Sequence, residues 1–224
     1  MTDEEYEAIV PDNRDLEYGE GFMKFLDLDH GWSSWLVGQI TWLMFQPRSA
    51  IEFGCGTGQL LASLMERGVV VLGVEKSAAC LKFAERHLRN LPRRIVIHDM
   101  CKPPCLPISS FYASRKADLA ISIEVLEHLP EEGADTAVKT ISDSADIALI
   151  TACPPTGRNP MLHLNEQPFD YWVSKFQAQG MEFDEAATIA FRTAMRGFYV
   201  MHGTGRLPIV PAWLFSSYIG VFCH

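Results

Sequence analysis

Acidic residues follow four short apolar stretches in the first two-thirds of the chain. The stretches lead into Glu52, Glu75, Asp99 and Glu124. Because ligands of open parallel sheets bind beyond the carboxyl ends of the strands, acids at successive strand ends are expected to line one crevice. Carboxylates accept hydrogen bonds from hydroxyl, amine and ammonium groups. The pattern therefore predicts a binding site for a small polar ligand.

Glycines alternate directly after the first of these acids. Gly54, Gly56 and Gly58 are followed by a helix-like segment from Gln59 to Arg67. Glycine tolerates positive φ and has no Cβ, so the backbone of such a turn can curl beneath a ligand. The exposed N–H groups of the following helix start favour an anionic group on that ligand. The alternative is a turn that only connects a strand to a helix.

Two histidines follow the fourth and fifth apolar stretches. His128 belongs to a Glu-x-x-Glu-His run that starts at Glu124, and His163 lies in a later loop. Either imidazole could act as a general base, and either could instead have a structural role. Together with Glu124 and Glu127 the two histidines could also hold one divalent metal ion. The prediction does not favour the metal.

Composition limits the class of protein. The 224 residues, 48% hydrophobic and 21% charged, suit a single α/β domain. Nineteen basic and 28 acidic residues give a net charge of −9, which argues against a broad nucleic-acid footprint. Six cysteines without a Cys-x-x-Cys pair, and no signal peptide, indicate a reduced cytoplasmic protein. The apolar run Leu207–Cys223 favours a buried strand over a membrane span.

The elements that must position these residues alternate regularly from Ser49 onward. This pattern predicts a mainly parallel, doubly wound sheet. We expect strands near 49–53, 69–74, 94–98, 117–122 and 146–152, helices near 58–67, 77–90, 133–143 and 168–179, and a last strand within 213–222. Before the sheet, Tyr18–Phe45 has helical spacing of apolar residues. The proline-containing stretches 100–116 and 153–167 are expected to be irregular loops with functional residues.

The motifs at the strand ends resemble those of the class I S-adenosylmethionine (SAM)-dependent methyltransferases. EFGCGTG is similar to their glycine motif, VLGVE to their ribose-binding acid, IHDM to their adenine-contacting strand end, and ISIEVLEHLP to their fourth motif. The resemblance covers about residues 49–152 and continues more weakly through ALITACPP and HLNEQPFDYWVSKFQAQGMEF. It implies a Rossmann-like, seven-stranded doubly wound sheet whose last strand is antiparallel, with an N-terminal helical lid.

The resemblance also implies a division of the chain and a cofactor site. Residues 1–224 would form one SAM-dependent methyltransferase domain, with a helical cap (1–46), a cofactor-binding half (47–152) and a substrate-side half (153–224). The glycines would line the methionine moiety, with Glu52 suited to its ammonium group. The expected cofactor-binding residues are Glu52, Gly54, Cys55, Gly56, Gly58, Glu75, Lys76, Asp99, Met100 and Glu124. Among these, Glu75 would bind the ribose, and Asp99 with Met100 the adenine.

The implied reaction is methyl transfer from SAM to a hydroxyl group of a small molecule or sugar. Oxygen is preferred because bases cluster near the expected methyl position, with His128 as first candidate and His163 as second. Neither a nucleic acid nor a membrane is the expected partner.

Three alternatives remain open. The Glu-x-x-Glu-His run and a later histidine resemble the small-RNA terminal 2′-O-methyltransferases, which grip a ribose diol through magnesium; a metal-assisted RNA ribose methyltransferase is the first alternative. The second is a nicotinamide-dependent oxidoreductase, although its usual Gly-x-Gly-x-x-Gly places the third glycine one residue later than here. The third is a noncatalytic partner subunit with the same fold.

Overall fold

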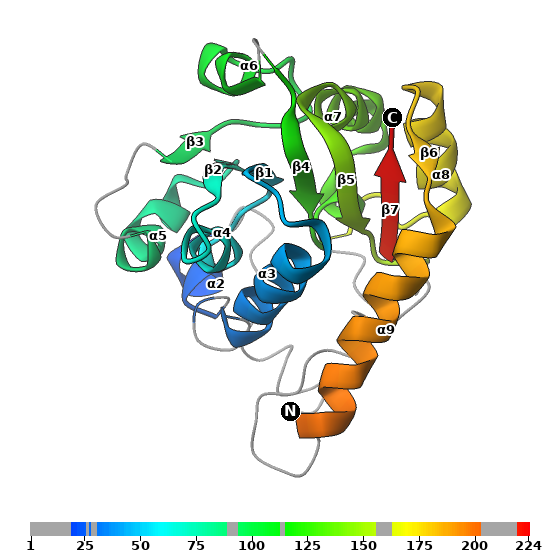
Figure 1. The fold of residues 1–224 in the computed structure, drawn as a ribbon. Helices are drawn as coiled ribbons and strands as arrows, with labels where there is room; N and C mark the ends of the chain where they lie inside the picture. Colours follow the sequence, from blue (N-terminus) through cyan, green and yellow to red (C-terminus); the bar gives the residue numbers. More distant parts are fainter. Residues whose placement is uncertain are drawn as a thin grey trace.

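A seven-stranded sheet organises the chain in the computed structural model (Figure 1). The structure describes residues 19–25, 27, 31–88, 94–112, 115–155, 163–202 and 219–224. The strands are β1 (Ser49–Phe53), β2 (Val70–Glu75), β3 (Ile95–Ile97), β4 (Ala117–Ser122), β5 (Ala145–Thr151), β6 (Glu182–Phe183) and β7 (Ile219–Cys223). The helices are α2 (Glu20–Phe25), α3 (Gly31–Phe45), α4 (Gln59–Met65), α5 (Leu81–His87), α6 (Leu106–Tyr112), α7 (Glu131–Ser144), α8 (Phe169–Ala178) and α9 (Glu185–His202). Two short 3-10 helices, η2 (Ala78–Cys80) and η4 (Leu126–His128), follow β2 and β4.

The strand order is β3-β2-β1-β4-β5-β7-β6. Strands β1 to β5 pair in parallel, and β7 pairs antiparallel with both β5 and β6. The predicted doubly wound sheet with an antiparallel last strand is therefore confirmed. The chain passes from β3 back to the centre of the sheet at β4, so the order reverses between β1 and β4. In open α/β sheets this reversal point is where ligands bind.

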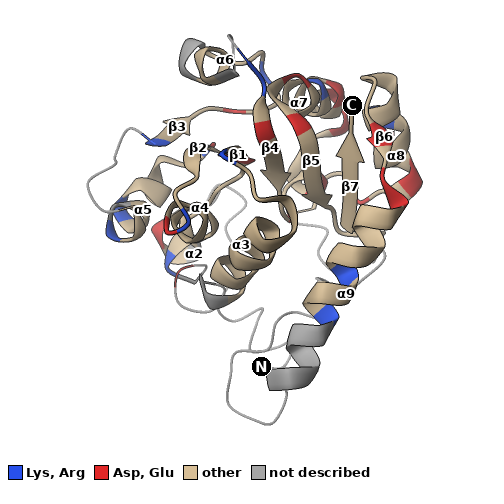
Figure 2. Cartoon of the chain, in the orientation of Figure 1, with Lys and Arg blue, Asp and Glu red and all other residues tan. Residues whose placement is uncertain are grey.

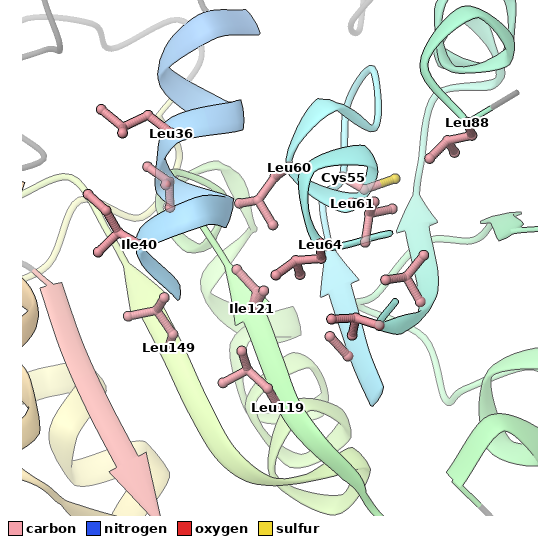
Figure 3. Close-up of a cluster of buried hydrophobic side chains, with 14 of the residues drawn as sticks. Leu36, Ile40, Cys55, Leu60, Leu61, Leu64, Leu88, Leu119, Ile121 and Leu149 are labelled. Carbon is pink, nitrogen blue, oxygen red and sulfur yellow. The ribbon is translucent and has the colours of Figure 1, made fainter. Parts of the chain in front are cut away.

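Alternate residues of each strand face two different hydrophobic clusters. On β1, Ala50 packs with α3, α4, α5 and α9, whereas Ile51 and Phe53 pack with α6, α7 and α8. Figure 3 shows part of the first cluster, in which Leu60, Leu61 and Leu64 of α4 lie over the sheet. Because successive side chains of a strand point to opposite faces of the sheet, a strand needs a nearly continuous apolar run to contribute to both hydrophobic clusters.

The main differences from the expected elements lie in the loops. Residues 100–116 contain a helix, α6, where an irregular stretch was expected. Pro107 stands in its first turn, where a missing N–H group breaks no helical hydrogen bond. The last strand was expected within 213–222, and the structure describes it as Ile219–Cys223, with 213–218 outside the described residues. No helix in the described part of the chain combines the length and apolar character required to cross a membrane.

Candidate functional site

The glycine turn lies where the strand order reverses. Gly54, Gly56 and Gly58 all have positive φ, at 75°, 49° and 76°. The amides of Gly54 and Cys55 both donate hydrogen bonds to the carbonyl oxygen of Val74, at 2.7 and 3.1 Å. These bonds hold the turn against the end of β2. A Cβ on Gly54 would lie 2.3 Å from Cγ2 of Val125. Glycine is thus required both by the backbone conformation and by the close approach of the loop after β4.

Glu75, the last residue of β2, holds the same turn. Its carboxylate accepts hydrogen bonds from the amides of Gly56 and Ser77, each at 3.0 Å. Burial raises the pKa of Glu75, although these two amides favour its charged form. A carboxylate has about four acceptor positions, so both oxygens can still accept hydroxyl donors from a ligand.

Glu52 is buried beneath the turn, with 5% of its surface exposed. Among the described residues, its Oε2 atom has no hydrogen-bond partner. Burial, together with the nearby Glu75 carboxyl, raises the pKa of Glu52 well above its usual value. A buried carboxyl oxygen without a hydrogen-bond partner lowers the stability of the protein. Such an unpaired oxygen is expected where the carboxyl pairs with a cationic ligand.

The predicted adenine contacts lie beside Glu75. The amide of His98 donates to the carbonyl of Glu75 at 2.8 Å, which brings the end of β3 next to that of β2. Asp99 accepts from the amide of Cys101 at 3.0 Å, and Met100 is buried. Lys76 is exposed. The structure therefore brings the expected residues of the first three strand ends to one edge of the sheet.

Glu124 lies across the reversal point from the glycine turn. It adopts a positive φ of 53°, and its amide donates to Oγ1 of Thr151 at 2.7 Å. The Thr151 hydroxyl in turn donates to Oε1 of Glu124 at 2.6 Å. Burial raises the pKa of Glu124, and the Thr151 hydrogen bond opposes this. Sequence reasoning missed Thr151, because a threonine that ends a buried strand gives no signal of its own.

Glu127 is completely buried in η4. Neither of its carboxyl oxygens makes a hydrogen bond of normal geometry within the described residues. Burial and the neighbouring Glu124 carboxyl raise the pKa of Glu127 well above its usual value, and backbone amides, including that of Cys153, offset this only in part. Such a side chain is costly unless a proton, a cation or another ligand satisfies it.

The two candidate bases meet beside Glu127. The rings of His128 and His163, 35 positions apart in the sequence, pack edge to face with centroids 4.6 Å apart. Nε2 of His128 lies 3.9 Å from Oε1 of Glu127. Nδ1 of His163 lies 2.7 Å from Oε1 of Glu166. Glu166 was not among the site residues predicted from the sequence.

These side chains also bring possible metal-ligand atoms close together, as a metal site requires. One ligand atom from each of Glu127, His128 and His163 lies within 4.8 Å of the others, and the same holds for Cys153, His163 and Glu166. Glu124, the fourth member of the predicted set, is not in either group. The unsatisfied carboxyl of Glu127 and the two imidazoles fit a divalent cation. Cys153 was not predicted, since an isolated cysteine has no metal-ligand spacing.

A pocket of about 410 Å³ lies elsewhere, between α2 and α5. Its lining includes Asp27 together with Lys82, Phe83 and Arg86 of α5. None of the predicted site residues lines it. The acidic residues at the strand ends and the reversal of strand order both favour the edge of the sheet at the glycine turn, rather than this pocket, as the functional site.

Residues 50–145 match the family model described as a methyltransferase domain. This region is therefore similar in sequence to methyltransferase domains. Over 88 residues the chain is 30% identical to the ubiquinone biosynthesis O-methyltransferase of Glaesserella parasuis serovar 5 (strain SH0165), a match that covers 37% of this chain and 35% of that protein. The chain thus matches about a third of the length of its curated relatives.

Solved structures show that the methyltransferase fold extends beyond the matched region. A structure of the complex between the Haloferax volcanii Trm112 methyltransferase activator and a methyltransferase matches with a TM-score of 0.64 and 12% identity, covering 96% of this chain and 98% of that chain. Magnesium protoporphyrin IX methyltransferase from Synechocystis PCC 6803 with bound SAM matches with a TM-score of 0.54 and 16% identity, covering 98% and 88%. At these identities the likeness establishes the fold, which is that of the class I SAM-dependent methyltransferases.

Proposed function

We propose that this protein transfers the methyl group of SAM to a hydroxyl group of a small molecule or sugar. The observation that carries the proposal is the pairing of two features across the reversal point of the sheet. On one side, the glycine turn lies next to the buried carboxyl of Glu52, whose Oε2 atom has no hydrogen-bond partner among the described residues. On the other, His128 and His163 lie against each other. The names of the curated relatives, ubiquinone biosynthesis O-methyltransferases, support oxygen as the acceptor atom.

The cofactor would occupy the edge formed by the first three strand ends. In this proposal Glu52 pairs with the ammonium group of the methionine moiety, and the turn from Gly54 to Gly58, with Cys55, surrounds that moiety. Glu75 accepts hydrogen bonds from the ribose diol, with Lys76 beside it. Asp99 and Met100 contact the adenine, and Glu124 closes the site from β4. The proposed division of the chain into 1–46, 47–152 and 153–224 follows from this arrangement.

The acceptor hydroxyl would approach from the side of His128 and His163. Methyl transfer is an in-line displacement, in which an oxygen lone pair forms the O–CH3 bond and the C–S electron pair returns to sulfur, leaving S-adenosylhomocysteine (SAH). The sulfonium donor is already activated, so the protein contributes mainly alignment of the reacting groups. The hydroxyl proton passes to an imidazole and from there to solvent.

Thermal shift with SAM, SAH and NADH tests the cofactor assignment. Both adenosyl compounds are expected to raise the melting temperature of the wild-type protein, because ligands that bind the folded state stabilise it. Glu75→Ala is expected to reduce that shift. Stabilisation by NADH alone would replace the proposal with the oxidoreductase alternative. Stabilisation by none of the three would favour the noncatalytic partner subunit.

The cluster of Glu127, His128 and His163 supports a second candidate, metal-assisted 2′-O-methylation of an RNA ribose. These three residues would hold the ion, which would supply Lewis-acid polarisation of the acceptor oxygens. The test is SAH release in the presence of a chelator, followed by addition of magnesium or manganese. Loss and recovery of turnover support this candidate, while turnover that is unaffected by the chelator excludes it.

A cytoplasmic location is also part of the proposal. All six cysteines are free. Free thiols are typical of proteins that function in a reducing compartment.

A further inference from the structure

The segment from His163 to Gln167 is fixed to the loop after β4. The amides of Leu164 and Asn165 both donate to the carbonyl oxygen of Glu127, at 2.8 and 2.9 Å. Within the segment, Nε2 of Gln167 donates to Oδ1 of Asn165 at 2.9 Å. These bonds hold the backbone next to His163 at a defined place beside η4.

The ring of His163 is held as well, by a hydrogen bond with Glu166. Oε1 of Glu166 lies 2.7 Å from Nδ1 of His163, and the two side chains are only 13% and 16% exposed. A carboxylate can accept a hydrogen bond but cannot donate one. Nδ1 of a neutral His163 must therefore carry the hydrogen, which leaves Nε2 with a free lone pair.

His128 is not oriented in the same way by its neighbouring acid. Its Nε2 atom lies 3.9 Å from Oε1 of Glu127, which is too long for a hydrogen bond. Glu127 therefore does not select a tautomer of His128 as Glu166 does for His163. For His163, the hydrogen bond with Glu166 defines which ring nitrogen is the acceptor.

We propose that Glu166 is a positioning residue for methyl transfer, which keeps the hydrogen of His163 on Nδ1 so that Nε2 receives the proton of the acceptor hydroxyl. This inference rests on the proposed function, because it assigns a direction to the proton in that reaction. It also reverses the order of the two bases expected from the sequence. Partners that fix the tautomer of metal-ligating histidines typically change activity by about 10- to 100-fold when they are removed, and we expect an effect of about that size for Glu166.

Nitrogen-15 NMR of the histidine side chains tests the tautomer directly. The protein is labelled on its histidines and measured at a pH at which the imidazoles are neutral, with His163→Gln used to assign the signals. In wild type, His163 is expected to show a protonated Nδ1 and an unprotonated Nε2. Glu166→Gln retains a carbonyl acceptor and is expected to keep this tautomer, whereas Glu166→Ala moves the hydrogen toward Nε2. Glu182→Gln, an exposed acid of β6, is the matched control and leaves the signals of His163 unchanged.

Two results would overturn the inference. One is a wild-type His163 that carries its hydrogen on Nε2, and the other is a Glu166→Ala spectrum identical to that of wild type. Thermal shift with SAM on the same samples separates this inference from the proposed function. A wild type that SAM does not stabilise would contradict the proposed function, whereas the tautomer is measured independently of the cofactor.

Turnover provides the second readout once an acceptor is identified. Glu166→Ala is expected to lower kcat by about 10- to 100-fold with little change in the KM for SAM. Glu166→Gln should retain the larger part of the activity, because it preserves the tautomer. Equal kcat values for wild type and Glu166→Ala would show that Glu166 does not position the base.

Discussion

At the scale of single residues, Glu52 is the most informative side chain. Its carboxyl is buried, and its Oε2 atom has no hydrogen-bond partner among the described residues, which is a cost that folding must offset. Its raised pKa means that the unfolded chain ionises this carboxyl at a lower pH than the folded chain does. The stability of the free protein is therefore expected to fall as the pH rises above the ordinary pKa of glutamate.

Glu52→Gln should make the free protein more stable at pH 7, by about 1–3 kcal/mol, because the amide carries no ionisation penalty. At about pH 4 the Glu52 carboxyl of the wild type is neutral, as the amide of the variant is. The difference in stability between the two proteins should therefore disappear. The same substitution should weaken SAM binding by about 10- to 100-fold through loss of the ammonium partner. Urea unfolding at the two pH values and calorimetric titration with SAM check these results. A Glu52→Gln protein that is less stable than wild type at pH 7, or that binds SAM equally well, would contradict this account.

Residue type explains which parts of the site the sequence could predict. Acids at strand ends stand out because they interrupt apolar runs, so Glu52, Glu75 and Asp99 could be selected before their surroundings were known. Thr151 and Cys153 could not, because their roles depend on which strand lies next to β4. Pairing of β4 with β5 is a tertiary contact, and neither residue carries a local pattern that reveals it.

At the scale of elements, the turn after β1 and the loop after β4 form one unit. Gly54 belongs to the turn, and the space that its missing Cβ leaves is occupied by the side chain of Val125. Adjacent parallel strands bring these two connections together, so the donor and acceptor sides of the proposed site are packed directly against each other.

Gly54→Ala is expected to destabilise the protein through two effects, the positive φ and the clash with Val125. Gly68→Ala is a matched control, since Gly68 has a φ of 81° and nothing within 4 Å of its added Cβ. The control should cost about 1 kcal/mol from conformational strain alone, and Gly54→Ala at least about 1–3 kcal/mol more. Denaturant unfolding measures both. Partial recovery in the double variant Gly54→Ala, Val125→Ala would identify the clash, and equal losses in the two single variants would refute it.

Asp27, which precedes α3, contacts helices α4 and α5. Its Oδ1 atom lies 2.9 Å from Nε2 of Gln59, the first residue of α4, and 2.5 Å from Nε2 of His87, the last residue of α5. Burial alone would raise the pKa of Asp27, but the hydrogen bonds of His87 and Gln59 outweigh it and hold the pKa below its usual value. The segment before α3 is thereby tied to the residue that follows the glycine turn.

Asp27→Asn should lower the free energy of unfolding by about 1–2 kcal/mol at pH 7. A depressed pKa gives stability that is present above the pKa of the unfolded chain and is lost as the pH falls through that of the folded chain. The difference between wild type and variant should therefore shrink toward pH 3. Asp143→Asn, which breaks an exposed pair with Lys139 on α7, is the control and should cost less than about 0.5 kcal/mol. A difference that persists undiminished at pH 3 would show that the Asp27 charge is not responsible.

At the scale of the whole molecule, the sequence predicted the sheet and its covering helices better than it predicted the order of the strands in that sheet. Apolar runs and helical periodicity indicated a doubly wound sheet because these patterns are local. The pairing of β7 with β5 and β6 joins residues more than 30 positions apart, and an antiparallel last strand was expected only from the family resemblance. Helix α6 was missed for the opposite reason, since nearby prolines suggested a loop although one of them stands where a helix tolerates it.

The charge of the whole molecule bears on the choice between the two candidate acceptors. Basic residues are spread over several described elements, including α5 and α9, and lie among acidic ones (Figure 2). With a net charge of −9, the protein is not expected to release many counterions on meeting an RNA phosphate backbone. A short labelled single-stranded RNA should therefore bind with a Kd weaker than about 10⁻⁴ M at low salt, as measured by fluorescence anisotropy. Tighter binding that weakens with salt, together with SAH release on an RNA whose terminal 2′-hydroxyl is free but not on one already methylated there, would favour the RNA ribose over a small molecule.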